Sequence, residues 1–167
     1  MLRDENGVWI HEKMQLHQLA FQYFKNLYSA SSDAFYPYPF RNMFPVLTND
    51  QVAELEKNLL DDEIKNALFQ MGALKAPGPD GVHALFFQIQ WPMVGKQICN
   101  FIQGVFNGDP TPPDLNNTLI VPIPKGEKPE LIMQFRPISL CNVLQKLISK
   151  VVVNHLKNIM PTLVSPN

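Results

Sequence analysis

The chain has 167 residues, a hydrophobic content of 46% and a formal net charge of −1 at pH 7. Its length suits one domain of common size, and its hydrophobic content is too high for wholesale disorder. The sequence shows neither an apolar run near the roughly 18 residues of a membrane span nor the layout of a signal peptide, so we expect an intracellular protein, in the cytoplasm or nucleus, with no membrane partner.

The first part of the chain predicts a helix followed by an irregular linker. After an Asn-Gly turn signal, apolar side chains recur at helical spacing over residues 16–27, and we expect this stripe to be core. Residues 29–47 are rich in proline and aromatic side chains without a period, which predicts the least ordered internal stretch. We therefore assign 1–47 to a helical and linker region, and 48–167 to a second domain.

Helical patterns dominate the chain from residue 48 to residue 107. Thr48-Asn49-Asp50-Gln51 has the composition of a capping box, and a further helix is predicted from Asp61 or Asp62 to about Gly72. Residues 82–91 also have a helical pattern. Pro92 suits the first turn of the next helix, which Asn107-Gly108 ends. Its predicted apolar face consists of Val94, Ile98, Phe101, Ile102, Val105 and Phe106.

Two short extended segments and a last helix complete the pattern. LIVPIP at 119–124 is branched and apolar, hence strand-like, although its prolines confine it to an edge or an irregular ladder. FRPISL at 135–140 is a second extended piece, and apolar residues at helical spacing predict a helix near 142–158. The fold class is therefore α+β, mostly helical, with one short antiparallel strand–loop–strand.

The heptad KAPGPDG at residues 75–81 interrupts the helices with two prolines and two glycines. Pro77 and Pro79 fix their own φ angles and push the preceding residues out of the helical region. Pro79-Asp80-Gly81 then supplies turn chemistry, with a glycine that can adopt positive φ. Considered alone, the heptad indicates a rigid connector between helices.

Three blocks together resemble a known family. KAPGPDG (75–81), TLIVPIPK (118–125) and FRPISLCNVLQKLISKVVVNHLK (135–157) stand in the order and approximate spacing found at the start of the reverse-transcriptase domain of non-LTR retrotransposons, especially plant LINE-type elements. The resemblance covers roughly residues 48–167. It implies a right-hand polymerase fold, of which this chain is the N-terminal fingers portion, truncated before the palm. Two departures are Gln145, where tyrosine is usual, and His155, where arginine is usual.

The resemblance implies that Lys125 and Arg136 contact the triphosphate of an incoming dNTP. A strand–loop–strand would bring both cations to one surface, where lysine acts as a point charge and arginine can bind phosphate oxygens bidentately. The alternative is a surface lysine and an arginine paired with Glu127 or Glu130. The residues alone favour neither reading, whereas the resemblance favours phosphate contact.

The template side of the resemblance involves the heptad and the last helix. In the family the heptad lies near the template strand, so Lys75, Gly78, Asp80 and Gly81 are candidates for a loop that guides a nucleic-acid backbone. Residues from 115 onward carry six Lys/Arg against two Asp/Glu, a balance of +4, which suits a polyanionic partner as readily as an ordinary solvated face. Candidate backbone contacts in the last helix are Lys146, Lys150 and Lys157.

The sequence offers no evident metal or catalytic centre. Asp61-Asp62-Glu63 suits the start of a helix, and Cys99 and Cys141 stand alone, without the clustering of a zinc site. The family is a nucleotidyltransferase that needs Mg²⁺ held by palm aspartates, so we expect a fragment of an RNA-directed DNA polymerase that is inactive alone. Its partners would be an RNA template, a DNA primer and dNTPs; the oligomeric state stays open. The alternative is a non-catalytic nucleic-acid-binding or structural remnant of a degenerate element.

Overall fold

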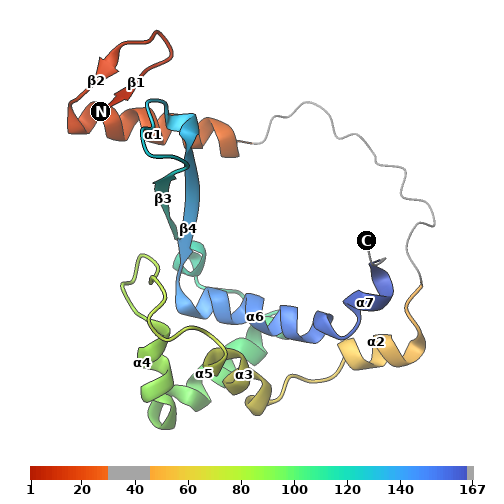
Figure 1. Ribbon diagram of the computed structural model, residues 1–167. Helices are drawn as coiled ribbons and strands as arrows, with labels where there is room; N and C mark the ends of the chain where they lie inside the picture. Colours follow the sequence, from red (N-terminus) through yellow and green to blue (C-terminus); the bar gives the residue numbers. More distant parts are fainter. Residues whose placement is uncertain (30–45, 165–167) are drawn as a thin grey trace. The chain divides into compact units, whose positions relative to one another are not determined.

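The computed structural model describes residues 1–29 and 46–164 (Figure 1). The chain divides into two compact units. Unit 1 contains Met1–Pro39 with Ile120–Ser139, and unit 2 contains Phe40–Leu119 with Leu140–Asn167. The strand–loop–strand thus groups with the N-terminal residues, and the domain boundary expected near residue 47 stays a prediction. Positions 30–45 of the predicted linker lie outside the described residues.

Unit 1 begins with a small hairpin and a helix. Strands β1 (Leu2–Arg3) and β2 (Trp9–Ile10) pair antiparallel, with Leu2 opposite Ile10. The turn between them is held by the Asp4 carboxylate, which accepts from the backbone N–H of Asn6 at 2.9 Å and of Val8 at 2.8 Å. Gly7 has a φ of 80°, which confirms the predicted turn.

Helix α1 (Lys13–Tyr28) confirms the helical pattern near the start of the chain but corrects its predicted burial. Phe24 is buried, with its ring edge-on to that of Tyr23 at a centroid distance of 5.2 Å. In contrast, Leu27 is 55% exposed. Periodicity fixes which side chains share a face, but it does not say how much of that face another element covers. The apolar stripe is therefore only partly core.

Unit 2 is built around helix α3 (Asp61–Phe69), which packs against both α5 (Trp91–Phe106) and α6 (Val143–Lys157). The short helices α2 (Asn49–Leu55) and α4 (Ala84–Ile89) also belong to this unit. The apolar faces of α3, α5 and α6 meet in one cluster. Its largest fully buried side chains are Ile64, Leu68, Ile102, Leu147, Val151 and Cys99.

The helix starts in unit 2 follow local sequence signals. Thr48 caps α2, since its hydroxyl accepts from the N–H of Gln51 at 3.3 Å while the Gln51 side chain accepts from the N–H of Thr48 at 2.9 Å. Helix α5 begins at Trp91 with Pro92 in its first turn, and Gly108 beyond its end has a φ of 95°. Ile98 and Ile102 are buried as predicted.

Not every residue of the predicted α5 face is core. Val105 is only half-buried and Phe106 is 41% exposed, because the last turn of the helix lies at the edge of the cluster. Helix α3 likewise ends at Phe69, before the predicted end at Gly72. Turn hydrogen bonds follow instead, including Lys75 N–H to the carbonyl of Gly72 at 3.2 Å.

The carboxylate of Asp61 ties α3 to α5. It accepts from Lys96 Nζ at 3.1 Å and from Gln103 Nε2 at 3.0 Å. Gln103 Nε2 also donates to the carbonyl of Leu59 at 2.8 Å. Cys99 is a buried free thiol. Its burial raises the pKa of the thiol, and the charge of Asp61 makes a smaller contribution in the same direction. Asp61 thus has a structural role at the start of α3.

The predicted strand–loop–strand is present as a two-stranded antiparallel sheet of β3 (Thr118–Pro124) and β4 (Phe135–Cys141) (Figure 1). Short 3-10 turns η1 (Pro113–Asn116) and η2 (Ile132–Gln134) precede the two strands, and α7 (Met160–Leu163) follows α6. In the described part of the chain, none of the helices is both long and apolar enough to cross a membrane.

Candidate functional site

The heptad loop docks on the start of α6. Lys146 Nζ donates to the carbonyl of Ala76 at 3.0 Å. Asn142, the residue before α6, bonds Asp80 in either orientation of its side-chain amide: the oxygen accepts from the Asp80 N–H at 3.3 Å, or the nitrogen donates to the Asp80 carboxylate at 3.2 Å. Near the start of the heptad, His83 Nδ1 lies 3.0 Å from the carbonyl of Lys75. These contacts hold the heptad in one position.

The glycines of the heptad have different structural roles. Gly81 has a φ of 71°, and its N–H donates to the carbonyl of Gly78 at 3.1 Å, which confirms the predicted turn. Gly78 is needed for close approach, since a Cβ there would lie 2.4 Å from the backbone nitrogen of Asn142 and 2.5 Å from the carbonyl carbon of Cys141. Gly78 is therefore buried, whereas Lys75, Asp80 and Gly81 are exposed.

The three candidate lysines of α6 differ in their surroundings. Lys146 is half-buried and its ammonium group is used by the heptad, so it has a structural role whether or not it contacts nucleic acid. Lys150 is half-buried as well. Lys157 is exposed and lies beside a polar cavity described below. The structure thus brings Lys75 and Lys146 to one loop–helix junction, and it leaves the nucleic-acid role of all three lysines as a prediction.

Lys125 lies at the point where β3 leaves the sheet. Its N–H donates to the carbonyl of Gln134 at 2.9 Å, and its Nζ donates to the carbonyl of Met133 at 2.9 Å. From this bond, and from the 3.5 Å contact of Thr118 Oγ1 with Cys141 Sγ at the other end of the strands, we expect Arg136 opposite Ile123, two residues before Lys125. Because side chains alternate with a period of two, that register directs Lys125 and Arg136 to the same face of the sheet.

Arg136 is exposed, and it forms no ion pair within residues 1–29 and 46–164. Of the two alternative partners considered from the sequence, Glu130 pairs instead with Arg3, whose Nε lies 3.3 Å from a Glu130 carboxylate oxygen, and Glu127 forms no ion pair within the described ranges. The Arg3 guanidinium also lies 4.5 Å from the centroid of the Trp9 ring. Arg136 is therefore an exposed cation on a short sheet, in a position to meet an anion.

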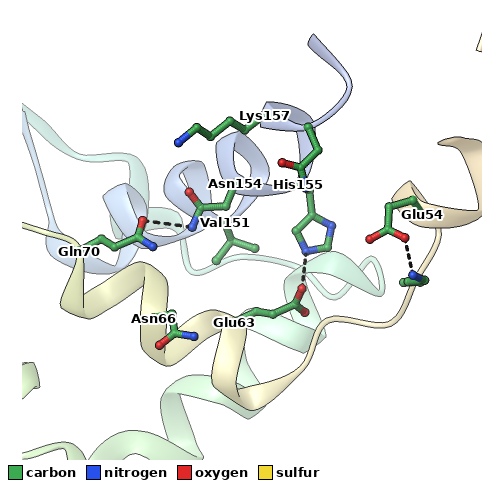
Figure 2. Close-up of a pocket in the computed structure, with 10 residues that line it drawn as sticks. Glu54, Glu63, Asn66, Gln70, Val151, Asn154, His155 and Lys157 are labelled. Atoms are coloured by element: carbon green, nitrogen blue, oxygen red, sulfur yellow. Dashed lines mark hydrogen bonds and ion pairs between the residues drawn. The ribbon is translucent and has the colours of Figure 1, made fainter. Parts of the chain in front are cut away.

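A polar cavity of about 330 Å³ lies between α3 and α6, and sequence reasoning did not find it. In Figure 2 Glu63 on α3 and His155 on α6 point toward one another, with Glu63 Oε1 3.6 Å from His155 Nε2. Gln70 Oε1 accepts from Asn154 Nδ2 at 3.5 Å, a second link between the same helices. The one hint in the sequence was His155, which replaces the arginine usual in the resembling family.

Comparison with known proteins gives one informative relationship. No family model matches the chain. The chain is 25% identical over 166 residues to a Xenopus laevis protein named Transposon TX1 uncharacterized 149 kDa protein. The match covers 98% of this chain but only 12% of that protein. The chain is thus similar along nearly its whole length to part of a transposon protein.

Proposed function

We propose that this chain is the fingers part of an RNA-directed DNA polymerase from a retrotransposon of the LINE type, related to those of plants. The observation that carries the proposal is Arg136, which is exposed on the β3–β4 sheet within the block FRPISL and has no ion pair in the described part of the chain. The three sequence blocks in family order and the similarity to a transposon protein support it. The fold assignment as polymerase fingers belongs to the same proposal.

In this proposal Lys125 and Arg136 bind the triphosphate of the incoming dNTP. The phosphates must be neutralised and held in line for attack, which is work for positioned cations. Arg136 makes two charge-assisted hydrogen bonds to phosphate oxygens. Lys125 supplies a mobile charge once its ammonium group leaves the carbonyl of Met133. The heptad with Lys75 faces the RNA template strand, and the DNA primer is held elsewhere in the complete polymerase.

Mg²⁺ belongs to a different part of the polymerase in this proposal. Among the described residues there is no group of three or more His, Cys, Asp or Glu side chains that could hold a metal ion. In this proposal the metal ligands and the catalytic residues lie in the palm. When bound in the palm, the metal ions stabilise the attacking and leaving oxygens of phosphoryl transfer.

The proposal predicts that Arg136→Lys weakens dNTP binding although the charge is conserved. Arginine can lose one of two hydrogen bonds to a charged group in this change, and such a bond contributes about 1.5–3 kcal/mol, so we expect the Kd to rise about tenfold or more. Arg136→Ala should weaken binding further, while Lys125→Arg should be tolerated better. The measurement is dNTP affinity, by titration of the chain joined to the palm of a LINE-type reverse transcriptase.

Lys128→Gln is the matched control, because Lys128 is an exposed cation in the loop between the two strands. It should leave the Kd within about twofold, since removing an exposed charge away from the ligand changes binding little. If Arg136→Lys and Arg136→Ala both leave the Kd for dNTP unchanged, Arg136 does not contact the triphosphate. The main support for triphosphate binding would then be lost.

A further inference from the structure

We infer that the polar cavity between α3 and α6 binds an unpaired nucleobase of a nucleic-acid strand. The inference rests on the proposed function in one respect, namely that the partner is a nucleic acid. It concerns a different surface from Lys125 and Arg136, because the cavity belongs entirely to unit 2. The base site can therefore exist or fail independently of the triphosphate site.

The lining of the cavity offers the hydrogen-bonding groups that a base edge requires. Four carboxamide side chains line it: Asn66 on α3, Gln70 just after α3, Asn154 on α6, and Asn158 just after α6. Figure 2 labels the first three. Gln70 Oε1 and Asn154 Nδ2 bond each other, whereas the carboxamides of Asn66 and Asn158 form no hydrogen bond within the described ranges, so each of these two can present both a donor and an acceptor. Bidentate pairing of Asn or Gln with a base is an established form of recognition. Only Val151 contributes an aliphatic side chain to the lining. A nucleobase edge matches this polar, two-sided chemistry better than an apolar peptide side chain does.

The charges around the cavity favour an uncharged ring with a phosphate at its rim. Glu54 is already paired with Lys57. Glu63 faces His155 and also accepts from the N–H of Leu60 at 2.8 Å. The carboxylates of Glu54 and Glu63 balance the ammonium groups of Lys57 and Lys157 in the lining. Lys157 is exposed and free of any ion pair within the described ranges, so it is available for the phosphate attached to the base.

The size of the cavity agrees with a single base. Its volume of about 330 Å³ lies near the lower end of the roughly 300–1,000 Å³ of ligand pockets. His155 is among the lining residues, with 17% of its side chain exposed, and its ring lies 6.5 Å from the ring of Phe106. Histidine is among the side chains on which unstacked bases are held. The cavity therefore combines a ring surface, base-edge partners and a phosphate partner in one place.

The test is a titration of the full chain with each of the common ribonucleoside monophosphates, followed by NMR of the side-chain amide groups. We expect at least one nucleotide to shift the NH₂ signals of Asn66, Gln70 and Asn154, and ribose 5-phosphate to leave them unchanged because it lacks a base. Asn66→Ala should weaken nucleotide binding at least fivefold. Asn100→Ala, which removes an exposed carboxamide from α5 outside the cavity, should leave binding unchanged.

Absence of these shifts with every nucleotide would overturn the inference. Equal shifts with ribose 5-phosphate would also overturn it, because they would indicate only a phosphate contact at Lys157. Shifts produced by an asparagine-rich peptide but by none of the nucleotides would likewise overturn it, in favour of a protein partner. If single-stranded RNA binds and perturbs only β3 and β4, the inference fails while the proposed function stands. If nucleotides shift the cavity amides but Arg136→Ala leaves dNTP affinity unchanged, the inference stands while the proposed triphosphate site fails.

Discussion

Ile102→Ala is expected to lower the free energy of unfolding of unit 2 by about 2–5 kcal/mol. Ile102 has no exposed surface and belongs to the cluster formed by α3, α5 and α6. The substitution removes buried methyl and methylene groups and leaves a cavity that close-packed neighbours fill only in part. The measurement is chemical denaturation followed by far-ultraviolet circular dichroism, because the helices of unit 2 dominate that signal.

Ile89→Ala is the matched control for this prediction. The chemistry of the change is the same, but Ile89 at the end of α4 is 63% exposed, so the loss should stay within about 0.5 kcal/mol. A loss below about 0.5 kcal/mol for Ile102→Ala as well would show that the core of unit 2 is not formed by this face of α5.

Gly78→Ala is expected to cost about 1–3 kcal/mol and to loosen the heptad from α6. The added methyl group would lie 2.4 Å from the backbone nitrogen of Asn142, and backbone atoms cannot move aside as the end of a flexible side chain can. The heptad must therefore shift, which disturbs the hydrogen bond from Lys146 Nζ to the carbonyl of Ala76. Chemical denaturation gives the energy, and amide hydrogen exchange over residues 76–82 reports the loosening.

Gly126→Ala provides the comparison, since a Cβ at Gly126 has no neighbouring atom within 4 Å. We expect its stability to equal or slightly exceed that of the parent chain, because alanine restricts the unfolded state. Unchanged stability and unchanged exchange in Gly78→Ala would mean that the heptad is not packed against the start of α6, and that its rigidity comes from the prolines alone.

Local signals in the sequence predicted most of the elements. The capping box at Thr48, the proline in the first turn of α5 and the glycine beyond its end each act within a few residues, so the start of α2 and both ends of α5 could be inferred without knowing the fold. The β3–β4 pair could also be predicted, because two branched segments separated by a polar loop favour a hairpin.

Burial could not be predicted to the same degree. The stripe on α1 shows a helical period, yet only Phe24 is fully covered, because the area that another element covers depends on contacts distant in sequence. The grouping of residues 120–139 with the N-terminal residues is another long-range effect. Neither follows from periodicity or turn chemistry.

In the candidate sites, too, local features could be predicted from the sequence and long-range contacts could not. The turn at Gly81 was evident from Pro79-Asp80-Gly81, but the packing of Gly78 against Asn142 joins positions far apart in the chain. The cavity between α3 and α6 was missed for a related reason. Asn66 and Asn154 each resemble ordinary solvated residues on a helix surface, and they mark a site only once the two helices lie side by side.

The most direct test of the proposed function is primer extension on an RNA template with Mg²⁺ and all four deoxynucleotides. We expect no extension by the chain alone and template-dependent extension when the chain is joined to the palm of a LINE-type reverse transcriptase. In the joined protein Arg136→Ala should abolish most of the extension, whereas Lys128→Gln should retain it. Extension by the chain alone above a heat-inactivated control would contradict the assignment of catalysis to the palm, and a joined protein without activity, or one indifferent to Arg136→Ala, would contradict the assignment of this chain as working fingers.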